Sequence, residues 1–200
     1  MTPDPMPAYS EAATDAFLKS CRKNFAYYKS LGDRTFDQLS EEELLSPPVT
    51  NSNSIAILVN HLWGNMRSRW TDFLTEDGEK DWRERDTEFM PIINSKAALL
   101  KKWEEGWACL FTALDSIDHS NFDQQVYIRR QAHSIPEAIH RQLAHYAMHV
   151  GQIIYIGKMT RGAEWTSLSI PLGKSAEFNA RKTRQGTHGG HFTDDLMSKK

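Results

Sequence analysis

Residues 141–159 read RQLAHYAMHVGQIIYIGKM and carry two histidines four positions apart, His145 and His149. Apolar residues recur through this stretch with a helical period, so the sequence predicts an α-helix here. Histidines spaced by four residues lie about one turn apart on the same helix face, where both imidazoles can reach one cation. A third ligand must come from elsewhere in the chain, and His61 is the best candidate.

The predicted helix separates a polar face from an apolar one. It begins near Ser134, which forms a capping-box pattern with Glu137, and ends before Gly162. The polar side chains that share the face of His145 are Arg141, Gln142, His149 and Gln152. This separation indicates a polar pocket beside the core. Gln142 and Gln152 are placed to hydrogen-bond the ring nitrogens that would face away from a metal.

Three imidazoles suit a divalent transition metal such as Zn, Ni or Fe. Three protein ligands leave a position for water or substrate, which is typical of catalytic rather than structural sites. The spacing alone is weak evidence, because eight histidines in this chain give such a pair by chance roughly one time in three. On spacing alone, ordinary histidines on a helix surface are the more frequent explanation. No glutamate follows the first histidine, so the sequence does not support the HExxH type of zinc site.

The candidate third ligand lies on a second predicted helix, residues 54–74. Beside His61, one face of this helix carries small and polar residues, among them Gly64, Asn65 and Ser68. Such a face leaves room above the imidazole, as a substrate cavity would require, or else it simply meets water. The sequence leaves both interpretations open, and Asn65 is a candidate pocket residue.

Arg141 lies about one turn before His145 on the same face of its helix. A guanidinium group there can bind a substrate carboxylate or phosphate. An ordinary salt bridge to an acid on another helix is an equal alternative.

The predicted fold is all-α, a four-helix bundle with a crossover segment and a packed C-terminal extension. The four long helices are expected at about residues 10–31, 54–74, 96–117 and 134–161, with the crossover at 121–133. Gly32 is expected to end the first helix, and residues 75–90 are expected to form a charged surface loop. Residues 165–179 are expected to pack onto the bundle. The predicted divisions are a flexible lead at 1–9, a domain at 10–180 and a disordered tail at 181–200.

Composition and charge restrict the partners. A net charge of −2 is no electrostatic footprint for nucleic acid or anionic lipid, so we expect neither nucleic acid nor membrane as a partner. No apolar run reaches the length of a membrane span, and the N-terminus does not resemble a signal peptide. Two cysteines are too few for a disulfide framework. The expected location is the cytoplasm.

Two strings carry a family resemblance. QLAHYAMHVGQIIYIGKM, residues 142–159, resembles the last core helix of the DinB/YfiT-like superfamily of metal-dependent enzymes. IAILVNHLWGNMRSRWTDFL, residues 55–74, resembles the second helix of that family, which supplies the first metal histidine. LSIPLGKSAEFN, residues 168–179, further resembles a branch of small bacterial proteins known only as a domain of unknown function. The resemblance covers residues 16–179 and implies His61, His145 and His149 as the metal ligands.

The resemblance also implies an activity, since characterised relatives transfer low-molecular-weight thiols to electrophiles. A divalent metal stabilises thiolate near neutral pH, and thiolate is the attacking species. The expected substrate is therefore a small molecule, with a low-molecular-weight thiol as one candidate. A metal-dependent hydrolase and a non-catalytic, stress-related metal-binding or dimeric interaction module are the alternatives. A homodimer is expected, because the apolar faces of the second and fourth helices exceed what one bundle needs.

Overall fold

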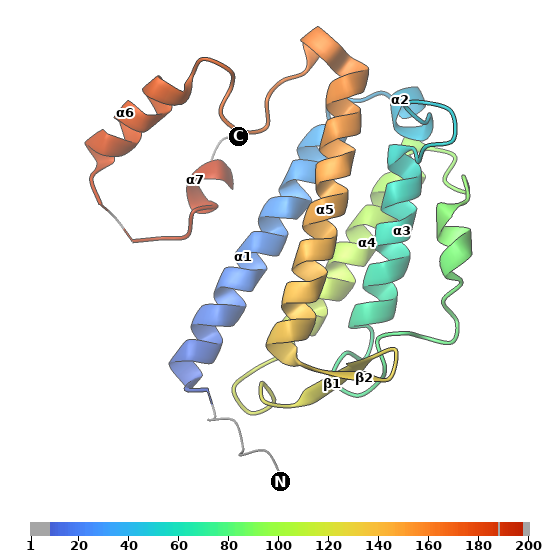
Figure 1. The fold of residues 1–200 in the computed structure, drawn as a ribbon, viewed down its shortest axis with the longest axis vertical. Coiled ribbons are helices and arrows are strands. Elements are labelled where there is room, and N and C mark those ends of the chain that lie inside the picture. The colour runs from blue at the N-terminus through green and yellow to red at the C-terminus, as the bar shows by residue number, and fades with distance from the viewer. Residues whose placement is uncertain (1–8, 188, 198–200) are drawn as a thin grey trace.

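Four long helices lie side by side in the computed structural model, which describes residues 9–187 and 189–197 (Figure 1). They are α1 (Glu11–Phe36), α3 (Ile55–Trp70), α4 (Lys96–Asp115) and α5 (Ile135–Arg161). Helix α3 packs most extensively on α4, and α1 packs on α5. The prediction of a mostly helical protein is confirmed.

Short elements connect these helices. They are α2 (Glu41–Leu45), the 3-10 helix η1 (Arg85–Phe89), the strands β1 (Gln125–Ile128) and β2 (Gln131–Ser134), and the 3-10 helix η2 (Gly162–Glu164). The strands form an antiparallel hairpin in which Gln125 pairs with Ser134. The turn residues Arg129 and Arg130 both have positive φ, and their backbone N–H groups donate to the carboxylate of Asp77 at 2.8 and 2.7 Å. The predicted crossover is therefore a hairpin anchored to the segment after α3.

Serine side chains begin each of the long helices. Ser10, Ser54, Ser95 and Ser134 each accept a hydrogen bond from the backbone of the first turn. Such caps satisfy backbone donors that have no partner inside the helix. The predicted capping box of Ser134 and Glu137 is present. These caps fix where α3 and α5 begin, and hence the register of their histidines.

Large aromatic side chains fill the space between the helices. Trp103 and Trp107 from α4, Phe25 from α1 and Tyr146 from α5 are all buried. Their rings meet edge to face or at a tilt, which is the favourable geometry for aromatic pairs. Trp70 donates its indole N–H to the Tyr146 hydroxyl at 2.9 Å, and that hydroxyl donates to Asn65, whereas the indole N–H of Trp107 bonds nothing among the described residues.

The prediction that Gly32 ends the first helix is wrong, because α1 continues to Phe36. Gly32 lies inside the helix against the indole of Trp103, and a Cβ atom there would overlap that ring. Trp103 also donates its indole N–H to Asp33 at 2.7 Å. The glycine therefore permits close packing of α4 on α1, and it does not stop the helix.

Residues 75–90 are a surface segment only in part, because many of them are exposed but the segment contains η1 and several buried charged side chains. This segment lies on α3 and buries Lys80 and Glu88 almost completely. The side chain of Arg83 is only 2% exposed. Helix α3 is consequently covered on nearly all sides by its own chain, as 13 of its residues are buried.

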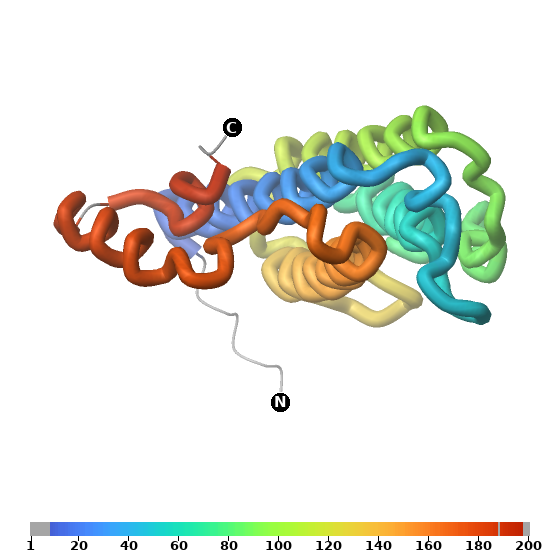
Figure 2. Tube along the Cα trace, turned by 90° about the horizontal axis from the view of Figure 1, so that it is seen from above, coloured from blue at the N-terminus to red at the C-terminus, as the bar shows by residue number. Residues whose placement is uncertain are grey.

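The C-terminal extension packs only at its start. Trp165 lies against Gly157 of α5, and the backbone N–H of Thr166 donates to Gln38 at 2.7 Å. Farther on, Leu172 is fully exposed, and α6 (Ser175–Gln185) buries none of its residues. Figures 1 and 2 show this part of the chain beside α1 and away from the other long helices. The predicted packing of residues 165–179 is thus wrong beyond Leu168, because the apolar residues that follow are too few and too scattered to cover a helix face.

The segment predicted as a disordered tail contains the end of α6 and α7 (Asp194–Met197), so the predicted boundary at residue 180 falls inside a helix. Lys23 of α1 pairs with Asp194 at 2.6 Å, which attaches α7 to α1. Of the predicted lead, only Tyr9 is among the described residues, and its ring lies edge to face on Phe122. None of the described helices combines the length and apolar character of a membrane span.

The packing around Gly32 gives a paired test. Alanine normally stabilises a helix interior relative to glycine by about 1 kcal/mol. We expect Gly151→Ala to follow this rule, because nothing lies within 4 Å of a Cβ atom at that position. We expect Gly32→Ala to destabilise the protein by about 1–3 kcal/mol, because the added methyl group would overlap Trp103. Urea unfolding of both variants measures the difference, and a stabilising Gly32→Ala would contradict the packing described.

Candidate metal centre

Three histidines meet between α3 and α5. His61 lies in the middle of α3, and His145 and His149 lie one turn apart on α5. The Nε2 atom of His145 is 3.3 Å from Nε2 of His61 and 3.0 Å from Nε2 of His149. One nitrogen from each ring falls within 4.8 Å of the other two. The structure therefore brings the three predicted residues together, with His61 and His149 buried and His145 half-buried.

The outer nitrogens of two of these rings are held by hydrogen bonds. His61 Nδ1 donates to Glu88 Oε2 at 2.8 Å, and His149 Nδ1 donates to Gln152 Oε1 at 2.8 Å. A ring that carries its proton on Nδ1 presents a lone pair at Nε2. Both lone pairs consequently point at the third imidazole. This is the arrangement of metal-binding histidines, whose outer nitrogen is oriented by a carboxylate or carbonyl group.

The electrostatics of Glu88 support this assignment. Burial by itself raises the pKa of Glu88, but hydrogen bonds from His61 and Arg83 outweigh it, and the pKa is lowered from its usual value. Arg83 holds this carboxylate with Nε at 2.7 Å and Nη2 at 3.0 Å. Glu88 is therefore ionised at neutral pH and can only accept from His61.

The donor set fits a divalent transition metal. Three Nε2 atoms converge, and only the one on His145 is free to carry a hydrogen. That single hydrogen cannot satisfy both neighbouring lone pairs, which lie 3.3 and 3.0 Å away on His61 and His149. Protonation does not relieve this, because burial and the neighbouring His149 and His61 lower the pKa of His145 to about 3. Burial also lowers the pKa of His149. Metal–imidazole bonds of about 2.0–2.1 Å separate adjacent donors by roughly 3.0–3.4 Å, which matches the spacing of these nitrogens.

A cavity of about 410 Å³ adjoins the histidines. It lies between α3, α5, η1 and the turn of the hairpin. Its lining residues are His61, Asn65, Arg69, Arg83, Arg85, Phe89, Arg129, Arg141, Gln142, His145, Met148 and His149. A volume of this size accommodates a small molecule next to the imidazoles.

The four other predicted site residues have different roles in the structure. Gln152 bonds His149 as expected. Gln142 lines the cavity and is buried, but its Oε1 atom bonds nothing among the described residues. Asn65 lines the cavity too and accepts a hydrogen bond from the Tyr146 hydroxyl at 3.0 Å. Arg141 forms no ion pair in the described part of the chain, and its Nη1 donates to His133 Nε2 at 2.9 Å. The salt-bridge alternative for Arg141 is therefore wrong.

Glu88 and Arg83 are not among the predicted site residues, because both fall in the segment interpreted as a surface loop. The small residues of α3 also have another role than the one predicted. A Cβ atom at Gly64 would overlap the Glu88 carboxylate, and Ser68 donates its hydroxyl to the Gly78 carbonyl at 2.7 Å. These residues are small because the segment after α3 approaches them closely, so Gly64 and Ser68 face neither a substrate nor water. Small residues opposite a charged segment were the available signal.

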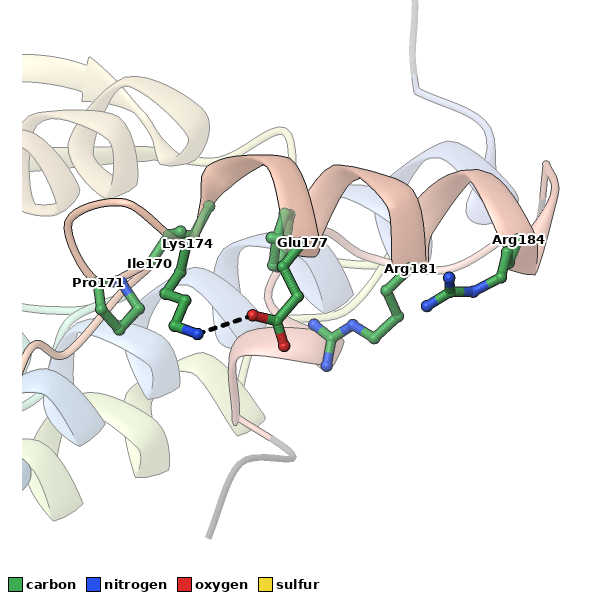
Figure 3. A pocket seen from close by; sticks show the side chains of 7 residues that line it. Ile170, Pro171, Lys174, Glu177, Arg181 and Arg184 are labelled. Atoms are coloured by element: carbon green, nitrogen blue, oxygen red, sulfur yellow. Dashed lines mark hydrogen bonds and ion pairs between the residues drawn. The ribbon is translucent and has the colours of Figure 1, made fainter.

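A second hollow, of about 290 Å³, runs along α6 (Figure 3). Lys174 pairs there with Glu177 at 3.0 Å, and Arg181 and Arg184 extend along the same helix (Figure 3). Its lining contains no histidine or cysteine, and the helix that forms it buries no residue. This hollow therefore offers no imidazole or thiol ligand for a metal.

Comparison with known proteins identifies one family. The model of the family described as "Protein of unknown function (DUF1572)" matches residues 12–174. The match includes the three histidines and Glu88 and ends just before α6. No curated protein and no solved structure matches this chain significantly.

The lowered pKa of His145 predicts a pH dependence of stability for the metal-free protein. In the unfolded chain His145 binds a proton near pH 6.5, whereas in the folded protein its pKa is about 3. The unfolded state therefore binds more protons between these values, and stability falls as the pH is lowered from 6.5 toward 3. We expect His145→Gln to reduce the loss between pH 6.5 and 4.5 by about 1–2 kcal/mol, allowing for partial exposure.

Urea unfolding in the presence of a chelator at several pH values measures this difference. The exposed His119 provides the control, since His119→Gln leaves the cluster intact. Parallel stability curves for the wild type and His145→Gln would show that His145 titrates like an exposed histidine.

Proposed function

This chain belongs to the DUF1572 family of proteins of unknown function, and we propose that it is a divalent-metal-dependent enzyme with His61, His145 and His149 as the metal ligands. The observation that carries the proposal is the convergence of the three rings, in which Nε2 of His145 lies 3.3 Å from that of His61 and 3.0 Å from that of His149. Hydrogen bonds from two outer nitrogens to Glu88 and Gln152 add support, because they turn the lone pairs inward.

The residues of the chain have distinct parts in this proposal. Glu88 fixes the tautomer and orientation of His61, and Gln152 does the same for His149. Arg83 keeps Glu88 ionised and in place. When bound, a divalent transition metal supplies a Lewis acid that favours the deprotonated form of a thiol or water ligand. The adjoining cavity provides the space in which a substrate meets that ligand.

The proposed reaction is the transfer of a low-molecular-weight thiol to an electrophile. This proposed reaction rests on the resemblance of residues 55–74 and 142–159 to the DinB/YfiT-like superfamily. We propose that α1, α3, α4 and α5 form a four-helix bundle of the type found in that superfamily. Hydrolysis is the alternative within the same class, since the same site would equally activate water. The substrate is a small molecule in either case, and the proposed location is the cytoplasm.

A non-catalytic metal-binding module is the competing proposal. A structural metal site is usually closed by four protein ligands, whereas a catalytic site keeps an open position. Among the described residues three histidines meet here, and a cavity of about 410 Å³ lies beside them. Both features favour an enzyme over a structural or stress-related metal-binding module.

The proposed homodimer has one candidate surface. Helix α3 offers no free apolar face, because its own chain covers it. Along α5, however, Met148, Tyr155 and Met159 are 52–67% exposed and lie on one side of the helix. The stretch from Gln142 to Gly157 contains no acidic or basic side chain other than its histidines. A second copy that packs on this face would cover these side chains.

Metal content tests the proposed site. We expect about one equivalent of a transition metal in protein purified without an affinity tag, since three neutral imidazoles form a competent donor set. His61→Ala and His145→Ala should each lose it, and His119→Ala should retain it because His119 is exposed and outside the cluster. Elemental analysis measures the metal, and circular dichroism confirms that the variants fold. Absence of metal from the wild type, even after reconstitution with zinc, nickel or iron salts, would overturn the proposal.

The role assigned to Glu88 has its own test. We expect Glu88→Gln to weaken metal affinity about 10–100-fold, because the amide is a poorer acceptor for the Nδ1–H of His61 than a carboxylate. Competition with a chelator of known affinity measures the change. Glu42→Gln on α2 provides a control with the same charge change at an exposed position outside the cavity. Equal affinities of the wild type and Glu88→Gln would mean that Glu88 only holds its segment on α3.

Oligomeric state tests the proposed dimer surface. We expect the wild type to sediment as a dimer at micromolar concentration, and Tyr155→Arg to sediment as a monomer. A charge at the centre of an apolar interface opposes association, because it must lose its water without gaining a partner. A monomeric wild type would rule out the dimer.

A further inference from the structure

The cavity beside the histidines is rich in arginine and lacks acidic lining residues. Five of its twelve lining residues are arginines, and none is aspartate or glutamate. The arginines are Arg69, Arg83, Arg85, Arg129 and Arg141. They come from α3, from the segment after it, from the hairpin and from α5, so four separate parts of the chain bring positive charge to one space.

Three of the five arginines have a structural use. Glu79 accepts from Arg69 and Arg129, each at 3.0 Å, and lies 3.6 Å from Arg83. Glu88 pairs with Arg83. These contacts hold the segment after α3 against α3 and the hairpin. Two carboxylates thus serve three guanidinium groups, and neither pairs with Arg85 or Arg141 among the described residues.

Arg85 and Arg141 are left without comparable partners. The acid that reaches Arg85 is Asp86, at 4.0 Å, and both side chains are more than half exposed, so water screens this pair. Arg141 has no ion pair within residues 9–187 and 189–197, and its hydrogen bond goes to the neutral acceptor His133. Both guanidinium groups line the cavity. Arg85 also lies over the Phe89 ring at 5.4 Å, but this contact brings no negative charge to its guanidinium group.

Two buried polar atoms at the same cavity lack hydrogen-bond partners. Gln142 is 4% exposed, and its Oε1 bonds nothing among the described residues. Arg83 Nη1 is likewise buried and makes no hydrogen bond. Buried polar groups are normally paired, because an unpaired one loses the hydrogen bonds it makes with water. Arg83 Nη1 faces Glu79 Oε2 at 3.6 Å, so the amide oxygen of Gln142 is the unpaired polar group on this wall that has no charged neighbour among the described residues.

We propose that this cavity binds a small molecule with an anionic group, a carboxylate or phosphate, which Arg141 and Arg85 hold at the solvent-facing edge. A planar guanidinium group binds either anion through two parallel hydrogen bonds. The reacting part of the molecule extends toward the histidines, with Gln142 on the wall beside it. A cavity of about 410 Å³ fits a small molecule and is too small for a macromolecule.

The anion subsite extends the proposed function by naming a class of substrate. The placement of the reacting end of the ligand at the histidines rests on that proposed function. The anion subsite itself needs no metal and can be tested without it. Succinate and inorganic phosphate are suitable probes, and succinamide is a neutral analogue of the first. Each is titrated by calorimetry into full-length protein freed of metal and then of chelator, at constant ionic strength.

The matched variants are Arg85→Gln with Arg141→Gln, which removes the two unpaired charges, and Arg184→Gln as the control. Arg184 lies on α6, beside α1 and away from η1 (Figure 1). We expect saturable binding of succinate or phosphate, weakened at least tenfold in the double variant and unchanged in Arg184→Gln, with no binding of succinamide. The stronger probe identifies the anionic group as a carboxylate or a phosphate.

Two results would overturn the inference. One is the absence of saturable binding of both anions, and the other is equal binding by the wild type and the double variant. Metal content of the double variant, expected to equal that of the wild type, separates the two proposals. If the protein binds metal but no anion, the proposed metalloenzyme stands and the proposed anion subsite is rejected. If it binds the anion but no metal, the anion subsite stands and the metalloenzyme is rejected.

Discussion

The chain of hydrogen bonds from Arg83 through Glu88 to His61 determines both how the segment after α3 folds and how the imidazole of His61 is oriented. The side chains of Arg83, Glu88 and His61 are 2%, 6% and 5% exposed. A buried carboxylate without partners would be strongly unfavourable, and Glu88 avoids this by accepting from both neighbours. Removal of Arg83 would leave an uncompensated carboxylate in the interior, and removal of His61 would take one hydrogen bond from it, so the segment has one favourable position on α3.

This constraint explains why the walls of the cavity come from distant parts of the sequence. Gly64 has no side chain because the Glu88 carboxylate occupies that space. Glu79, from the same segment, reaches Arg69 on α3 and Arg129 in the hairpin turn. The hairpin turn is fixed in turn by Asp77, which accepts two backbone N–H groups. A single ionic arrangement therefore joins α3, the segment that follows it and the hairpin into one side of the cavity, with α5 as the other side.

Features that depend on local periodicity could be predicted from the sequence. The burial of a charged residue could not, because it depends on a side chain far away in the sequence. The spacing of His145 and His149 and the cap at Ser134 are local patterns, and the structure contains both. Residues 75–90 looked exposed because charged residues rarely lie in an interior, and nothing local reveals that Glu88 meets Arg83 and His61. A glycine in a sequence is equally ambiguous, because it can mark the end of a helix or a place where another side chain packs closely on the backbone. For Gly32 the position of the Trp103 ring decides in favour of close packing.

Charge at the centre connects the histidines with the arginines around them. Neutral imidazoles bring no negative charge to a divalent ion, and the nearest carboxylate, Glu88, is already shared between His61 and Arg83. Arg69 and Arg83 are close enough to contribute to the lowered pKa of His145, after burial and the neighbouring histidines. The surroundings therefore remain positive, and a group that is negative in its reactive form, such as thiolate or hydroxide, gains more there than its neutral parent acid. The arginines around the cavity would thus favour deprotonation of such a group and attract an anionic substrate, two effects of one electric field.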